Sequence, residues 1–169
     1  MGFHRRILKN HVALRYAMNL WPPFVGAGIC VDEISKDFRK VRVRLKDLRI
    51  NRNYVGTHFG GSLFAMTDPY FMIMVLHNLG SKYHVWDKHA QIEFIKPGRG
   101  TLRADLLITE EELEEIKKAT ALGQKYERLF QVEVKDEKEQ LICRVQKLIY
   151  ARLKPKYRPA VNLKIVDNE

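Results

Sequence analysis

The alternation of apolar and polar residues predicts a short helix and two strands at the start of the chain. Apolar residues recur near helical spacing over residues 7–20, and a Trp-Pro-Pro sequence at 21–23 ends this segment, because the residue before a proline is pushed out of the α region. Strands are expected over residues 27–34 and 40–48. The second has a period of two, with one apolar and one basic face. The basic face could contact phosphates or simply be solvated, and the pattern leaves both open.

A long apolar segment over residues 59–79 predicts a buried helix. Its only charged residue is Asp68, and apolar residues occur nearly all round the helix. Gly80 suits the C-terminal cap, whereas Pro69 removes one backbone hydrogen bond and bends the helix near its middle. Such a helix needs cover on most sides, which a sheet wrapped around it would provide.

The rest of the chain is predicted to be mainly strand, with one short acidic helix over residues 110–121. Thr109 and Glu112 form the capping box that starts this helix, and Gly123 ends it. Strands are predicted at residues 89–95, 101–108, 124–135 and 140–153, the last two paired as a hairpin. One central helix followed by antiparallel strands is an α+β arrangement.

The length of 169 residues fits one main domain. We expect a helical arm over residues 1–24, a single domain over residues 25–153 and a charged tail over residues 154–169. The arm is expected to pack on the domain, although its amphipathic pattern also suits a helix that lies on a membrane surface.

Composition and charge narrow the classes of function. Lys and Arg total 30 against 20 for Asp and Glu, and this net charge of +10 favours an anionic partner such as nucleic acid, a membrane surface or a phosphorylated small molecule. The sequence lacks the interleaved aromatic residues of an RNA-binding motif and any zinc-finger spacing, so no nucleic-acid partner is expected. Because no apolar run is long enough to span a membrane and no secretory signal is evident, we expect a cytoplasmic protein.

Neither a metal site nor a serine-hydrolase site is predicted. Cys30 and Cys143 lack the spacing of a metal site or a disulfide framework, and we expect two buried free thiols. The histidines show no ligand spacing, and Ser62 does not lie in a G-x-S-x-G elbow.

The residues that point to chemistry precede and open the long helix. Gly60 and Gly61 stand at its start, where backbone N–H groups have no partner within the helix and point along the positive end of the helix dipole. Such groups are suited to a developing oxyanion. Asp68 follows eight residues after Gly60, and a lone carboxylate in an apolar helix is costly unless it is paired or exposed in a cleft. Asn53 could offer its amide to a carbonyl or a water.

The pattern N-x-x-G-T-x-x-G-G-x-x-x-x-x-x-D, formed here by Asn53, Gly56, Thr57, Gly60, Gly61 and Asp68, resembles the active-site segment of hotdog-fold thioesterases of the phenylacetyl-CoA type. The element order over most of the chain is similar to that fold as well. The resemblance implies an acyl-CoA thioesterase that needs no cofactor and forms a homodimer or a dimer of dimers, with the active site where two subunits meet.

The resemblance also implies roles for individual residues. Asp68 would be the base or nucleophile, the Gly60 N–H would polarise the thioester carbonyl, and Asn53 would hold substrate or water. Substrate-binding positions would be Gly61, Thr57, His58 and Phe59.

The chain departs from the family pattern at one position. Those enzymes commonly have a histidine directly before the two glycines, where this chain has Phe59, and His58 stands one place earlier. This departure keeps open a non-catalytic hotdog protein that binds acyl-CoA or lipid. A basic nucleic-acid-binding protein is the second alternative.

Overall fold

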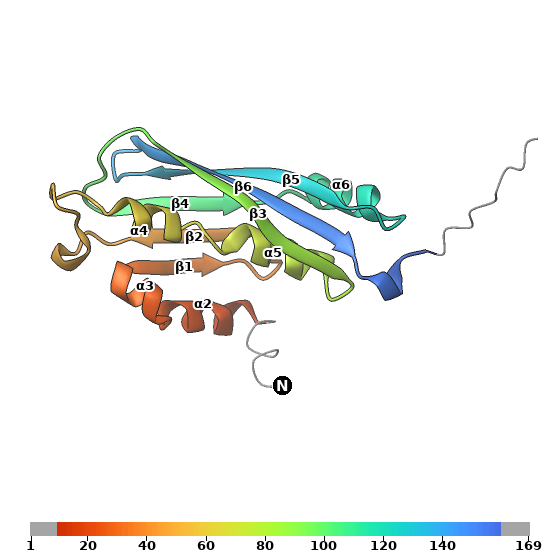
Figure 1. The fold of residues 1–169 in the computed structure, drawn as a ribbon. Coiled ribbons are helices and arrows are strands. Elements are labelled where there is room, and N and C mark those ends of the chain that lie inside the picture. Colours follow the sequence, from red (N-terminus) through yellow and green to blue (C-terminus); the bar gives the residue numbers. More distant parts are fainter. Residues whose placement is uncertain (1–9, 160–169) are drawn as a thin grey trace, which may run out of the picture.

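The computed structural model describes residues 10–159 and has an α+β fold in which a broken central helix packs on one face of a six-stranded antiparallel sheet (Figure 1). The strand order is β1-β2-β4-β5-β6-β3. The strands are β1 (Ile29–Ile34), β2 (Lys40–Leu45), β3 (Tyr83–Phe94), β4 (Leu102–Leu107), β5 (Tyr126–Lys135) and β6 (Leu141–Leu153). The helices are α2 (His11–Asn19), α3 (Pro22–Ala27), α4 (Gly60–Ala65), α5 (Tyr70–Leu79) and α6 (Glu110–Thr120), with 3-10 turns η1 (Arg49–Asn51) and η2 (Pro155–Tyr157). The predicted hotdog architecture is confirmed.

The N-terminal region contains two helices where the sequence predicted one. The first is α2, which corresponds to the helix predicted over residues 7–20. Residues 7–9 of that prediction lie outside the described part of the chain. The Trp-Pro-Pro sequence ends α2 as expected, but its two prolines then begin α3, because a proline fits the first turn of a helix, where its missing N–H would have no partner. Gly28, with a φ of 74°, ends α3, so β1 starts two residues later than predicted.

Side chains of α2 cover the outer edge of β1. The Asn19 side chain donates to the carbonyl of Val31 and accepts from its N–H, at 3.0 and 2.7 Å. Arg15 donates to the carbonyl of Asp32, and Nδ1 of His11 donates to that of Ile34. An exposed strand edge is a template for pairing with another chain, and these bonds occupy this edge.

The outward face of β2 carries the predicted basic residues, and acidic neighbours pair with them. Arg44 lies 2.8 Å from Asp32 on β1, and Arg42 lies 2.9 Å from Asp105 on β4. The strand itself ends at Leu45, three residues before the predicted end. The face is therefore a solvated network of ion pairs, which leaves less positive charge free for phosphates than the sequence suggested.

The central helix is broken at its middle. The sequence predicted one helix over residues 59–79 with a bend at Pro69, whereas the structure has α4 and α5 separated by a turn at residues 66–69. Pro69 lacks the N–H that would continue α4 and starts α5 instead. One side of both helices is buried on the sheet, and Gly80 ends α5 as predicted. The opposite side forms a stripe of partly or fully exposed residues at helical spacing: Phe64, Ala65, Asp68, Pro69, Met72, Ile73 and Leu76.

Strand β3 begins six residues before the predicted strand at residues 89–95. A bulge between Asp87 and His89 interrupts its pairing with β6, so the sequence alternation is lost there. The acidic helix α6 has the predicted capping box, with Thr109 and Glu112 bonded to each other's backbone N–H. The predicted β5–β6 hairpin is confirmed.

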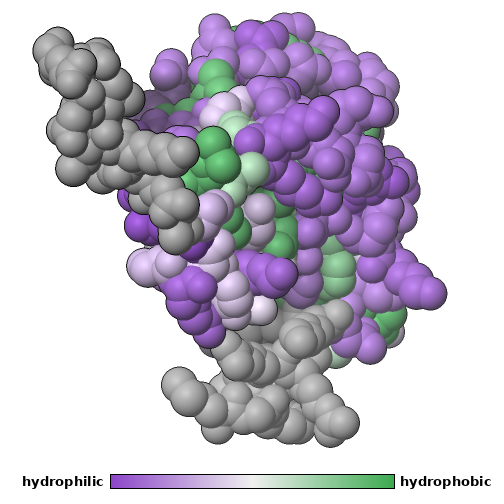
Figure 2. All heavy atoms as spheres, turned by 90° about the vertical axis from the view of Figure 1, so that its right-hand side faces the viewer, coloured by the Kyte–Doolittle hydropathy of each residue, from purple (hydrophilic) through white to green (hydrophobic). Residues whose placement is uncertain are grey.

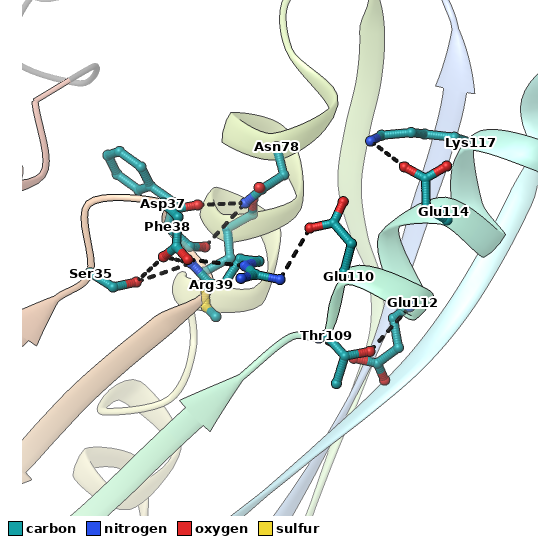
Figure 3. A network of polar contacts seen from close by, with 11 residues as sticks. Ser35, Asp37, Phe38, Arg39, Asn78, Thr109, Glu110, Glu112, Glu114 and Lys117 are labelled. Atoms are coloured by element: carbon teal, nitrogen blue, oxygen red, sulfur yellow. Dashed lines mark hydrogen bonds and ion pairs between the residues drawn. The ribbon is translucent and has the colours of Figure 1, made fainter.

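A polar network joins the β1–β2 turn to α5 and α6 (Figure 3). The side chain of Asn78 donates to the carbonyls of Asp37 and Phe38, both at 3.2 Å. Arg39 links Asp37 to Glu110 at the start of α6, at 3.0 and 3.1 Å. This network fixes the end of the central helix that lies away from Gly60.

The end of the molecule that faces right in Figure 1 is mainly hydrophilic at its surface, with small separated apolar areas (Figure 2). Within residues 10–159, no helix is long and apolar enough to cross a membrane. Of the two cysteines expected to be buried, Cys143 is buried and Cys30 only half-buried. Burial raises the pKa of the Cys143 thiol to about 12.

Candidate functional site

A cavity of about 600 Å³ lies where the loop before α4 meets the β3–β4 loop, at the left of Figure 1. Four of the residues predicted for the site line it: Asn53, Thr57, His58 and Gly60. Its apolar lining is provided by Val55, Leu63, Phe94, Ile95 and Pro97. Two cationic side chains, Lys96 and Arg99, also line it. The cavity thus combines apolar surface with positive charge.

Asn53 uses its whole side-chain amide within its own loop. Its Nδ2 donates to Oγ1 of Thr57 at 2.8 Å and to the carbonyl of His58 at 3.2 Å. Its Oδ1 accepts from the N–H groups of Val55 and Thr57 at 3.1 and 3.0 Å. Asn53 therefore shapes the cavity wall, and in this structure its amide has no hydrogen left to donate to a ligand.

His58 is buried and held in one orientation. Its Nε2 donates to the carbonyl of Gly100 at 2.7 Å, because a carbonyl can only accept. The N–H of Gly100 in turn donates to Asp47 at 2.9 Å. Nδ1 of His58 is buried and has no hydrogen-bond partner among residues 10–159. The ring is thus a fixed part of the cavity wall.

Phenylalanine rings lie close to the two glycines at the start of α4. A Cβ at Gly60 would lie 3.0 Å from the Phe94 ring, and one at Gly61 would collide with the Phe59 ring. Phe59 is 57% exposed and, like Gly61, does not line the cavity. The N–H groups of both glycines stand before the first intrahelical hydrogen bond, so α4 offers them no acceptor. Gly60 is the one of the pair that borders the cavity.

Asp68 does not line this cavity. It lies in the turn between α4 and α5, eight residues after Gly60, which corresponds to about 12 Å along a helix axis. Its side chain is 54% exposed, and its Oδ1 accepts a hydrogen bond of 2.6 Å from Lys147 Nζ on β6. A single chain therefore does not bring Asp68 and Gly60 to one point.

Lys147 and Asp87 were not identified from the sequence. Lys147 is 1% exposed, and its Nζ lies 3.4 Å from Oδ1 of Asp87 on β3. Burial raises the pKa of Asp87, and the Lys147 ammonium partly offsets this effect. The available signal was that Lys147 falls on the apolar side of the β6 alternation, between Val145 and Ile149.

Among residues 10–159, no group of three or more His, Cys, Asp or Glu side chains is arranged to hold a metal ion. The groups present around the candidate site include the Asp68 carboxylate, the Lys147 ammonium and the backbone N–H groups that open α4. These groups suit acid–base or nucleophilic attack on a polarised carbonyl.

Comparisons with known proteins agree with this fold. The sequence model of a domain of unknown function, DUF4442, matches residues 9–151. No curated protein sequence matches the chain. A protein of unknown function from Pseudomonas aeruginosa, described as a probable thioesterase, superposes with a TM-score of 0.73 at 19% identity, covering 83% of this chain and 93% of that one.

Two further solved structures have the same fold. A thioesterase from Haemophilus influenzae gives a TM-score of 0.63 at 13% identity, with 85% of this chain and 91% of that one covered. A protein of unknown function from Chlorobaculum tepidum gives 0.66 at 13% identity, with coverage of 86% and 98%. At these identities the likeness establishes the shared fold.

Proposed function

Because this chain belongs to the DUF4442 family and has the hotdog fold, we propose that it is a thioesterase that hydrolyses acyl-CoA. The observation that carries the proposal is that Gly60 borders a cavity and is followed eight residues later by the exposed carboxylate of Asp68. This spacing matches the active-site segment of hotdog thioesterases. The thioesterase descriptions of two structural neighbours support the same reaction class.

In the proposed reaction, the Gly60 N–H donates to the thioester carbonyl oxygen and stabilises the negative charge that develops there. Asp68 either takes a proton from water, whose hydroxide then attacks the carbonyl carbon, or attacks that carbon itself. The carbon–sulfur bond breaks, and the CoA thiolate leaves and takes up a proton. If Asp68 attacks, water then hydrolyses the acyl-enzyme anhydride to the free acid.

The proposed site needs a second copy of the chain. Reacting atoms must approach to about 3–3.5 Å, whereas Gly60 and Asp68 of one chain are separated by about 12 Å along the helix. If two central helices pack antiparallel about a two-fold axis near Phe64 and Ala65, Gly60 of one copy faces Asp68 of the other. The stripe of mainly apolar, half-buried or exposed residues on α4 and α5 runs through these positions, which supports this packing.

The two edges of the sheet favour the same assembly. The β1 edge is occupied by side chains of α2, as described above. The other edge strand, β3, pairs only with β6 within the described residues and exposes 62% of Trp86 and 56% of Phe94. A long edge strand with exposed aromatic residues is a site for pairing with another chain. We therefore place the homodimer contact at β3 and the helix stripe.

The lining of the cavity supports a CoA thioester as the substrate. Its apolar residues can contact an acyl group or the pantetheine arm, and Lys96 and Arg99 can contact phosphates. Most basic residues on the outward face of β2 are already paired with carboxylates. Lys96 and Arg99 at the cavity are therefore more suitable partners for the CoA phosphates than the basic residues of β2.

A panel of acyl-CoA esters of different chain length tests the proposal through release of free thiol. We expect turnover by the wild type and a loss of about 10²-fold or more in kcat for Asp68→Asn, because the amide keeps the shape and removes the base or nucleophile. Asp105→Asn, which changes an exposed carboxylate on the outer sheet face, is the matched control and should keep wild-type rates. Equal rates for Asp68→Asn and the wild type would exclude this assignment.

Phe59 favours one other function, a hotdog protein that binds acyl-CoA without hydrolysing it. Phe59 occupies the position of the histidine common in the related enzymes, and its exposed ring offers no proton-transfer group. Tight binding of acyl-CoA to the wild type without thiol release across the panel would favour this function over the thioesterase.

A further inference from the structure

Lys147 is a lysine in the core of the protein. It projects from β6 on the side that carries Val145 and Ile149, both buried, and only 1% of its side chain is exposed. Lysines are almost never fully buried unless they are paired, because removing the ammonium from water is costly. Its partners therefore explain why this position tolerates a charge.

Three groups from three different elements surround its ammonium. Oδ1 of Asp68, in the turn between α4 and α5, accepts at 2.6 Å. Oδ1 of Asp87 on β3 lies at 3.4 Å, and the ring of Phe64 on α4 lies with its centroid at 5.5 Å. Asp87 precedes the β3 bulge and shares the inward side of that strand with Val85. The ammonium is thus held from the sheet and the helix at once.

Lys147 and Asp68 differ in exposure, and the buried lysine is the partner that is fixed in place. Lys147 is enclosed by the core, whereas 54% of the Asp68 side chain is exposed. Only Oδ1 of Asp68 is bonded to the lysine, and no hydrogen bond to Oδ2 is formed within residues 10–159. The buried lysine therefore holds one oxygen of the carboxylate in place, and the other oxygen has no such bond among these residues.

Packing alone does not account for a lysine here. Replacing a buried ion pair by apolar side chains of similar volume is often neutral or stabilising, so a need for stability is a weak explanation of this charge. An unbranched apolar residue such as methionine fits a similar volume. The charge has its clearest effect on the exposed carboxylate that it holds.

We propose that Lys147, supported by Asp87, is a positioning residue that holds Oδ1 of Asp68 and orients Oδ2 toward the substrate. This inference rests on the proposed function, because it assigns Lys147 a role in the action of Asp68. Lys147 itself touches no substrate. It acts only through the carboxylate, so its loss affects the chemical step more than substrate binding.

Steady-state kinetics of Lys147→Met separate an effect on the chemical step from an effect on substrate binding. We expect kcat to fall on the order of 10- to 100-fold, with KM within about 3-fold of the wild type. The reason is that a displacement of a catalytic group by about 1 Å can lower the rate about 10²-fold. Lys147→Arg keeps the charge and should recover part of the rate. The control is Lys135→Met, which changes a half-buried lysine on β5 that pairs with Glu133 at 3.5 Å and should keep wild-type constants.

Each outcome decides the inference. If Asp68→Asn is inactive while a folded Lys147→Met has the wild-type kcat, the positioning role is wrong and the thioesterase proposal stands. If the wild type hydrolyses no CoA ester, the proposed function fails and this inference fails with it. If circular dichroism shows that Lys147→Met does not fold, Asp87→Asn replaces it. It should lower kcat about 2- to 10-fold at unchanged KM, since it loosens the lysine, and an unchanged kcat would overturn the role.

Discussion

Asn53 illustrates how one residue can shape the site through hydrogen bonds inside its own loop. Its amide makes four hydrogen bonds inside the loop that carries Thr57 and His58. This loop forms one side of the cavity, and Gly60 follows it directly at the start of α4. The conformation of the loop therefore decides where the proposed oxyanion donor stands.

Asn53→Ala should weaken turnover less than Asp68→Asn and should also lower stability. We expect kcat/KM to fall about 10-fold, because the donor is displaced but the carboxylate remains. Loss of the loop hydrogen bonds should lower the free energy of unfolding by about 1–3 kcal/mol. Thermal unfolding and thiol release measure the two effects. A variant with wild-type stability and no activity would instead indicate direct contact between Asn53 and the substrate.

At the residue scale, the sequence pointed to the segment from Asn53 to Asp68 but not to the residues that pair with the Asp68 carboxylate. The spacing from Asn53 to Asp68 was readable because it lies in one continuous segment. Lys147 lies 79 residues beyond Asp68, and a charge in an alternating strand is most often solvated. Only the fold shows that this lysine faces inward and meets the carboxylate.

At the scale of elements, strong local signals were predicted well and tertiary effects were missed. Helix α6 was located to within one residue by its capping box, which is a local interaction. The first half of β3 was missed because its bulge breaks the alternation, and α3 was missed because its prolines serve both as an end and as a start. The local sequence pattern does not distinguish a proline that ends one helix from a proline that begins the next.

The β1–β2 turn provides a pH-dependent prediction at this scale. The hydrogen bond from Ser35, together with smaller contributions from Arg39, lowers the pKa of Asp37 from 3.8 to about 2. A carboxyl group with a depressed pKa in the folded protein contributes stability above its unfolded pKa of 3.8, and this stability is lost as the pH falls through about 2. Asp37 is half exposed, so the contribution is at most about 1 kcal/mol.

Urea unfolding of the wild type and Asp37→Asn at a series of pH values measures this contribution. The wild type should be the more stable at neutral pH, and the difference should shrink between pH 4 and about pH 2, because protonation removes the charge that the variant lacks. A difference that stays constant down to pH 2 would show that the Asp37 charge has no part in holding the turn.

At the scale of the whole molecule, the two sheet edges have opposite roles. Helix α2 covers β1 with side-chain hydrogen bonds, and the DUF4442 match begins at residue 9, so it includes this helix. Within residues 10–159, strand β3 pairs with β6 alone, and it lies next to the helix stripe that carries Asp68. The proposed assembly joins these two open surfaces and completes a site that one chain holds only in part.

Activity of mixed dimers tests the shared site most directly. Gly60→Leu places a side chain into the cavity beside Phe94, and Asp68→Asn removes the carboxylate, so each variant alone should be inactive. In the proposed arrangement, Gly60 of one subunit faces Asp68 of the other, so a mixed dimer has one intact site of two. Random reassociation of equal amounts should therefore restore about a quarter of wild-type thiol release. If light scattering shows dimers of both variants and the mixture stays inactive, the shared site is contradicted.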